Sequence, residues 1–257
     1  MALLEVEALT KSFGGVTAIA DLGFEVPEGL VYSVIGPNGA GKTTLFNMLS
    51  GIYRPDEGSI RFMDQGVVGR QPHQVAALGI SRTFQNLQMF FNMSVLDNVM
   101  VGCHLRTRTG LFSAALRLPR IKREEMLSRQ WAQDALAICN LDKFIGQEAG
   151  SLPYGVLKRL EIARALAVQP RLLLMDEPAA GLNDTETLEM RKLIRRICDS
   201  GITVLLVEHN MGLVMQVSDR VLVLDYGSRL AEGTPVEIQN DRRVIEAYLG
   251  GEVRYAL

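Results

Sequence analysis

Gly36-Pro37-Asn38-Gly39-Ala40-Gly41-Lys42-Thr43-Thr44 is the stretch of sequence that decides the fold of this chain. It fits the pattern G-x-x-x-x-G-K-[S/T], in which the backbone N–H groups of a glycine-rich loop surround the phosphates of a nucleotide. Lys42 adds a mobile cation for the β- and γ-phosphates, and Thr43 offers a hydroxyl to Mg²⁺. The stretch therefore predicts a nucleoside triphosphate site, without saying what the triphosphate is used for.

The residues on both sides of the loop fit the same motif. The run 31–35 is rich in β-forming residues, and 44–49 carries apolar residues at helical spacing. Strand, loop and helix is the order that a phosphate loop requires, because the helix then directs its positive dipole end at the anion. A chance glycine-rich turn is the alternative, and these flanks argue against it.

Composition narrows the class of protein. The chain has 257 residues, 47% of them hydrophobic, which allows one large domain or two small ones with a substantial core. A net charge of −2 gives no overall basic surface for nucleic acid. No apolar run approaches the roughly 18 residues that span a bilayer, and the N-terminus has no signal-peptide pattern. The three cysteines show no metal-ligand spacing, so we expect buried, reduced thiols in a cytoplasmic protein.

A second group of chemically useful residues follows an apolar run. Residues 172–175 are all apolar and lead into Asp176 and Glu177, a pattern that predicts a strand buried on both faces of a parallel sheet. Ligands of open α/β sheets bind at the carboxyl ends of the strands. Asp176 can therefore hold Mg²⁺ and Glu177 can polarise an attacking water. The alternative is a pair of charges that stabilises the N-terminus of the next helix.

A third run, 202–207, predicts another buried strand, and His209 follows it. A lone histidine at a strand end is usually structural. Here it lies at the expected nucleotide edge, where an imidazole can contact a γ-phosphate. Between the two runs, the apolar residues are spaced as on a crossover helix. These residues are Met190, Leu193, Ile194 and Ile197.

The N-terminal part has the pattern of short strands at 3–9 and 22–26, and 80–85 returns to strand. Phe13 lies in the turn between the first two. It is either the anchor of an ordinary hairpin, which the residues alone favour, or a flat surface on which a base stacks.

Segment 86–150 has a helical pattern without β-rich runs. Four residues at helical spacing place Trp131 in the core; they are Leu127, Trp131, Ala135 and Ile138. Six basic residues in 104–123 flank the mainly apolar stretch 111–116. They form either a solvated helix pair or a basic amphipathic face toward a membrane or a partner. The last twenty residues predict one or two surface helices.

Leu152-Pro153-Tyr154-Gly155-Val156 and the helical run to Leu166 resemble the signature of ATP-binding cassette (ABC) ATPases. Six features occur in the order and at the spacing of that family, over essentially the whole chain. They are the phosphate loop, Gln85, this signature, 172–178, 180–183 and His209. The chain is most similar to the ATP-binding subunits of bacterial branched-chain amino acid importers, through residues 109–113, 160–166 and 177–183.

The resemblance implies an α/β fold. It would have a RecA-like phosphate-loop core with a mainly parallel sheet, an N-terminal antiparallel β subdomain and an α-helical subdomain. In this chain, one ABC ATPase domain would cover 1–257. Residues 1–85 and 166–235 would form the β subdomain and nucleotide-binding core, 86–165 the helical subdomain with the signature, and 236–257 the C-terminal helices.

The resemblance also implies roles for the residues. ATP would bind at Phe13, Gly36, Pro37, Asn38, Gly39, Ala40, Gly41, Lys42, Thr43, Thr44, Pro153, Tyr154 and Gly155. Mg²⁺ would bind at Thr43, Gln85 and Asp176. The catalytic set would be Glu177 as general base, His209 on the γ-phosphate, Gln85 and Lys42. Phe13 would stack on adenine, which reverses the preference stated above.

The partners follow from the same family. Two cassettes, identical or paralogous, would pair head to tail around two ATP molecules, with 180–183 crossing the interface. Residues 86–150 would dock a transmembrane permease at the cytoplasmic face of the inner membrane. A periplasmic solute-binding protein would act indirectly, and no nucleic acid would be involved.

The signature departs from the usual Leu-Ser-Gly-Gly-Gln, because Pro153 replaces the serine and Val156 the glutamine. Proline has neither a hydroxyl nor an N–H, so γ-phosphate donors are missing and we expect a working but slower site.

Two other functional classes remain as alternatives to an importer subunit. A soluble cassette acting on DNA or ribosomes usually has two cassettes or a long coiled-coil insert. A non-hydrolysing regulatory cassette would not need all of Lys42, Asp176, Glu177 and His209. Importers of amides or urea also resemble this chain.

Overall fold

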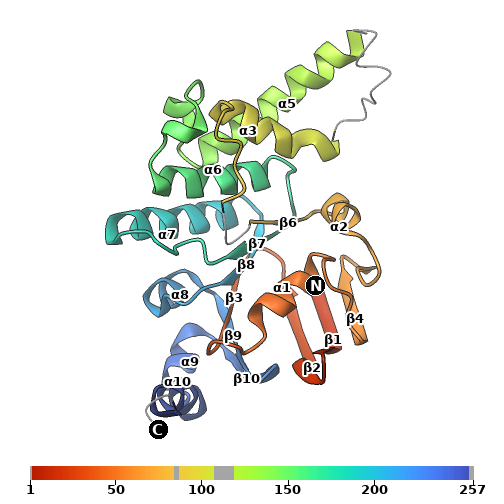
Figure 1. The fold of residues 1–257 in the computed structure, drawn as a ribbon, viewed down its shortest axis with the longest axis vertical. Coiled ribbons are helices and arrows are strands. Elements are labelled where there is room, and N and C mark those ends of the chain that lie inside the picture. The colour runs from red at the N-terminus through yellow and green to blue at the C-terminus, as the bar shows by residue number, and fades with distance from the viewer. Residues whose placement is uncertain (1, 84–86, 107–118, 255–257) are drawn as a thin grey trace.

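Strand β3 (Val31–Ile35), which leads into the phosphate loop, lies inside a six-stranded sheet. The structure is a computed structural model that describes residues 2–83, 87–106 and 119–254 (Figure 1). The strand order is β10-β9-β3-β8-β7-β6, and every neighbouring pair is parallel except β10 with β9. The other strands are β6 (Ile80–Arg82), β7 (Leu172–Asp176), β8 (Thr203–Val207), β9 (Arg220–Asp225) and β10 (Ser228–Gly233).

Alternate residues of the central strands pack into two different cores. Every residue of β3, β7 and β8 is buried, which for β7 and β8 confirms the prediction from the apolar runs. Leu173 and Met175 join a core that also contains residues of 95–102, 119–138, 154–166 and 184–199. Leu172 and Leu174 join the core around α1 (Lys42–Leu49). Successive side chains of a strand point to opposite faces, so one short run connects both halves of the molecule.

A separate antiparallel sheet has the order β2-β1-β4-β5. Its strands are β1 (Ala2–Phe13), β2 (Val16–Pro27), β4 (Glu57–Phe62) and β5 (Gln65–Gly66). The expected strands at 3–9 and 22–26 were too short, because each strand of the hairpin has twelve residues. Polar pairs such as Ser12 and Thr17, whose hydroxyl oxygens lie 3.1 Å apart, extend the hairpin along its solvated part. The hairpin turns at Gly14 and Gly15.

Helices α3, α5 and α6 pack against one another at one end of the molecule, opposite α9 and α10 (Figure 1). The described α-helices other than α1 are α2 (Pro72–Leu78), α3 (Val95–Gly102), α5 (Pro119–Ile138), α6 (Tyr154–Leu166), α7 (Asp184–Asp199), α8 (Met211–Val217), α9 (Pro235–Asn240) and α10 (Arg242–Arg254). Short 3₁₀ turns cover Cys103–Arg106, Asp142–Phe144 and Ala149–Ser151. None of the helices in the described ranges is long and apolar enough to cross a membrane. The predicted α/β class, with a mainly parallel sheet, an antiparallel sheet and a group of helices, is confirmed.

The core-facing stripe of α5 differs in part from the prediction. Trp131 packs partly buried against the core, and the guanidinium of Arg106 lies 3.5 Å from its ring centroid. Leu127, however, is 41% exposed, so the expectation that it faces the core was wrong. Four other described residues of α5 are buried and form the stripe that faces the core. The buried residues are Ser128, Ala132, Ala135 and Leu136.

Some predictions concern residues that lie outside the described part of the chain. The strand expected at 80–85 ends at Arg82, and residues 84–86, with Gln85, lie outside the described part. Most of the basic segment 104–123 and the stretch 109–113 also lie outside it. All three cysteines are free and buried, as expected.

Candidate nucleotide site

The loop Gly36–Thr44 joins the end of β3 to the start of α1, and two of its glycines are required by close contacts. Gly36 has φ +153°, and a Cβ there would lie 2.1 Å from the carbonyl oxygen of Leu224. Gly41 has φ +101°, and its Cβ would lie 2.5 Å from the carbonyl oxygen of Ala18. The loop therefore follows a path, wedged between β9 and β2, that no other residue type can take at these positions.

Lys42, the first residue of α1, is buried and folds back over the loop. Its Nζ donates hydrogen bonds to the carbonyl oxygens of Gly36 (2.7 Å) and Pro37 (2.9 Å). Burial lowers the pKa of Lys42, while the charges of Glu177 and Asp176 act to raise it. The ammonium thus sits in the field of both carboxylates, and the adjacent Thr43 is exposed.

The N-termini of α1 and α6 have no side-chain cap. Helix α1 starts after Gly41 and α6 after Pro153, and neither has a capping side chain or an acidic residue in its first turn. By contrast, Asn183 caps α7 and Thr234 caps α9. The first N–H groups of a helix need partners, and an anion is the natural one. Helix α1 begins at the phosphate loop and α6 at the signature, and both N-termini are expected to face phosphate groups.

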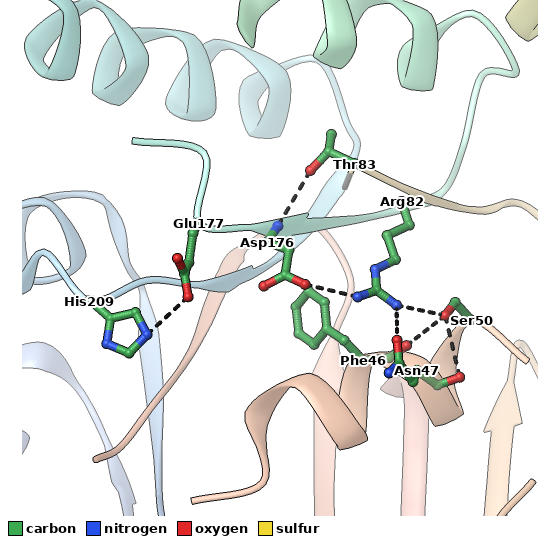
Figure 2. A network of polar contacts seen from close by, with 8 residues as sticks. All are labelled: Phe46, Asn47, Ser50, Arg82, Thr83, Asp176, Glu177 and His209. Atoms are coloured by element: carbon green, nitrogen blue, oxygen red, sulfur yellow. Dashed lines mark hydrogen bonds and ion pairs between the residues drawn. The ribbon is translucent and has the colours of Figure 1, made fainter. Parts of the chain in front are cut away.

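Glu177 and His209 meet at the carboxyl ends of β7 and β8 (Figure 2). His209 Nε2 lies 3.0 Å from Glu177 Oε1. Glu177 has φ +48°, a left-handed conformation that is costly for a residue with a side chain. Its N–H donates to the carbonyl oxygen of Val207 at 2.9 Å, which ties the strained residue to β8. The geometry holds a carboxylate and an imidazole at the sheet edge.

Glu208 is a residue whose importance sequence reasoning missed. It is buried, and its carboxylate accepts hydrogen bonds from the N–H groups of Ala179 (2.8 Å), His209 (3.0 Å) and Asn210 (3.2 Å). One side chain thus fixes both the loop after Glu177 and the turn that carries His209. The sequence feature that could have pointed to Glu208 was an acidic residue directly after a run expected to form a buried strand.

Arg82 is the second residue that was missed. Its guanidinium lies 2.8 Å from Asp176 Oδ2 and also contacts side chains of α1 (Figure 2). The available signal was a basic residue at the end of a strand that leads to Gln85.

Phe13 closes the β1–β2 hairpin, since it pairs with Val16. Its ring packs edge-on against Tyr53, with ring centroids 5.3 Å apart, and 44% of the residue remains exposed. The contacts with Tyr53 and with Lys11, whose Nζ lies 5.3 Å from the ring centroid, fit a hairpin anchor, and stacking on a base stays a prediction.

The signature contacts the segment after Glu177 in its own chain. The Tyr154 hydroxyl lies 3.4 Å from the carbonyl oxygen of Ala180, and a Cβ on Gly155 would lie 2.3 Å from Glu186 Oε1. Pro153 is the N-cap residue of α6, just before the first turn, and Val156 is buried. Val156, which stands where the usual signature has glutamine, packs into the core of the helical end.

Comparison with known proteins also indicates an ATP-binding protein. A sequence model described as "ABC transporter" matches residues 19–180, and one described as "Branched-chain amino acid ATP-binding cassette transporter" matches residues 228–254. BraF of Pseudomonas aeruginosa, a "high-affinity branched-chain amino acid transport ATP-binding protein", is 43% identical over 96% of this chain and 98% of its own. LivG of Escherichia coli, which carries the same description, is also 43% identical over 96% of this chain and 98% of its own.

Among solved structures, the ADP conformation of MJ1267, an ATP-binding cassette of an ABC transporter, superposes with a TM-score of 0.85. It is 32% identical, and the match covers 97% of this chain and 99% of that one. The phosphate loop, the acidic edge of the sheet and these full-length similarities lead to one conclusion: the chain belongs to the ABC transporter family, as one of its ATP-hydrolysing cassettes.

Proposed function

We propose that this chain is the ATPase subunit of a membrane importer, which couples ATP binding and hydrolysis to the uptake of branched-chain or related amino acids. The observation that carries the ATPase assignment is the Glu177–His209 pair at the edge of the sheet, within the field of Lys42. The amino acid assignment rests on similarity along nearly the whole of BraF and LivG, together with the C-terminal match at 228–254.

The residues present fit ATP and Mg²⁺. The uncapped N-terminus of α1 and the Lys42 ammonium offer donors and charge to the β- and γ-phosphates. The Thr43 hydroxyl, an Asp176 carboxylate oxygen and Gln85 are the protein's oxygen donors for Mg²⁺, which when bound neutralises charge on the phosphates. Within the described ranges, no three His, Cys, Asp or Glu side chains are grouped to hold a metal alone. Mg²⁺ would therefore depend on phosphate oxygens for part of its shell.

Glu177 accepts the proton of the attacking water in this proposal, and His209 contacts the γ-phosphate. Their 3.0 Å contact keeps both side chains at the sheet edge. Lys42 releases the two loop carbonyls that it now contacts and turns to the phosphates. Phe13 stacks on adenine through its exposed face. Gln85 orients the water and links the site to the membrane partner.

A complete site needs a second cassette. The uncapped N-terminus of α6, with Pro153, Tyr154 and Gly155, faces the γ-phosphate bound by the other subunit, and 180–183 crosses the interface. The subunits are two copies of this chain or this chain and a paralogue. We assign 1–85 and 166–235 to the β subdomain and nucleotide-binding core, 86–165 to a helical subdomain and 236–257 to the C-terminal helices. The helical subdomain docks a permease at the cytoplasmic face of the inner membrane, and a periplasmic binding protein delivers the solute to that permease.

The proposal is tested with the complete transporter. The chain is co-expressed with permease subunits, a second cassette and a binding protein, and uptake of labelled leucine is measured in reconstituted vesicles that enclose ATP, or no ATP, and have the binding protein outside. ATP-dependent leucine uptake that stops when Lys42→Ala replaces the parent supports the proposal. Uptake of glutamine or urea in place of leucine would make the chain an amide or urea importer cassette. Purification with ribosomes or nucleic acid instead of membranes would refute the importer assignment.

A further inference from the structure

The guanidinium of Arg82 lies where three parts of the site meet (Figure 2). From the end of β6 it donates to Asp176 Oδ2 at the end of β7, at 2.8 Å. Its other terminal nitrogen donates to Asn47 Oδ1 (2.7 Å) and Ser50 Oγ (3.1 Å), both on or just after α1. One side chain thus connects the carboxylate proposed for Mg²⁺, the helix that follows the phosphate loop and the strand that leads toward Gln85.

The ion pair between Arg82 and Asp176 is buried. The side chains of Arg82 and Asp176 are 9% and 5% exposed. The ring of Phe46 covers the guanidinium, with a centroid distance of 5.6 Å. A buried ion pair adds little net stability compared with apolar residues, but removing one partner leaves an uncompensated charge and a carboxylate without a fixed orientation. The pair is therefore better suited to positioning than to stabilisation.

Asp176 is held from several directions. Arg82 binds one carboxylate oxygen, the Asp176 N–H lies 3.4 Å from Thr83 Oγ1, and the Thr83 N–H donates to the carbonyl oxygen of Leu174 at 2.9 Å. Arg82 engages Oδ2, and Figure 2 shows the second carboxylate oxygen on the side away from Arg82. A metal ion prefers such a fixed oxygen, because its coordination geometry tolerates little displacement.

We infer that Arg82 is a positioning residue, which sets the Asp176 carboxylate in register with α1 so that Mg²⁺ strengthens ATP binding. The inference deepens the proposed function and rests on it. Arginine is required because its planar fork reaches Asp176 and the Asn47–Ser50 pair at once, whereas a lysine ammonium can satisfy only one side.

The test measures the affinity of the purified full chain for a fluorescent ATP analogue in Mg²⁺ and in EDTA. The ratio of the two dissociation constants is the magnesium factor. Arg82→Gln is expected to lower this factor about tenfold or more, as for loss of a hydrogen bond to a charged group, with the affinity in EDTA within about twofold of the parent. Arg82→Lys should give an intermediate factor. Arg61→Gln, which removes an exposed arginine paired with Glu5 and Glu7, should leave the factor unchanged.

A double-variant cycle separates positioning from a general structural role. If Arg82 acts through Asp176, Arg82→Gln has no further effect on the magnesium factor in an Asp176→Asn background. An equal fall in both backgrounds, or an equal fall in Mg²⁺ and EDTA, would overturn the inference. Thermal unfolding shows which variants are folded. If Arg82→Gln is not, the same cycle is run with Arg82→Lys, whose factor must fall in the parent background and not in Asp176→Asn.

The two proposals fail in different ways. A folded parent chain that binds no ATP in either buffer refutes the proposed function. A parent with a clear magnesium factor that Arg82→Gln and Arg82→Lys both preserve refutes only the role of Arg82.

Discussion

His209 Nε2 lies 3.0 Å from Glu177 Oε1, although the two residues are held by different strands of the sheet. Glu208 fixes the backbone on both sides of this contact. The His209 ring therefore has a prepared position from which it can contact a γ-phosphate and steady the carboxylate.

His209→Ala should lower the rate of ATP hydrolysis about a hundredfold, the lower range for a group that acts at the transition state, with ATP affinity little changed. Hydrolysis is measured by phosphate release in the complete transporter. His73→Ala is the matched control, because His73 is exposed on α2. An equal fall in the control, or no fall in His209→Ala, would remove His209 from the site.

Glu208→Ala should destabilise the chain without any contact to nucleotide. Three N–H groups would lose their acceptor, and we expect the free energy of unfolding to fall by about 2–4 kcal/mol, since buried donors without partners are costly. Urea denaturation measures the change. Glu246→Ala, on an exposed residue of α10, should stay within about 0.5 kcal/mol of the parent. A Glu208→Ala value as small as that of the control would contradict this role.

Pro153→Ser restores a hydroxyl and an N–H at the start of α6. A hydrogen bond to a charged phosphate is worth about 1.5–3 kcal/mol, so we expect at least about tenfold tighter ATP binding in the assembled transporter, or a faster hydrolysis rate. The isolated chain should bind ATP as the parent does, because the signature acts on the nucleotide of the other subunit. Unchanged rate and affinity in the transporter would show that the missing donors do not limit the site.

Phe13→Ala should weaken ATP binding by the isolated chain about five- to twentyfold, from the loss of aromatic stacking. Inorganic triphosphate, which has no base, should bind the variant and the parent equally. Phe90→Ala removes an aromatic residue of similar exposure from the helical end and serves as the control. If Phe13→Ala weakened triphosphate and ATP to the same extent, the ring would be a hairpin anchor only.

The sequence predicted the parts of the fold that local patterns determine. The buried runs at 172–175 and 202–207 became strands of a parallel sheet, because continuous apolar residues suit a strand covered on both faces. The hairpin of β1 and β2 was underestimated, because its outer part is polar and gives no apolar alternation. Leu127 was misplaced because helical spacing alone does not show which of two adjacent stripes faces the core.

The network around the site could not be predicted in the same way. Arg82 and Asp176 are 94 positions apart in the sequence, and Glu208 and Ala179 are 29 apart. Neither pair belongs to a spacing pattern. Each contact arises because parallel strands bring their carboxyl ends to one edge, which the sequence predicts, and because particular side chains then reach one another, which only the structure shows.

The most direct test of the account is single-turnover ATP hydrolysis by Glu177→Gln in the complete transporter, with Glu246→Gln as the matched control. The account predicts that the variant binds ATP with nearly the affinity of the parent and hydrolyses it about 10²–10⁴ times more slowly, because the general base is lost while the phosphate loop is intact. Hydrolysis at the parental rate by a folded Glu177→Gln chain would contradict the central claim that Glu177 activates the water in this cassette.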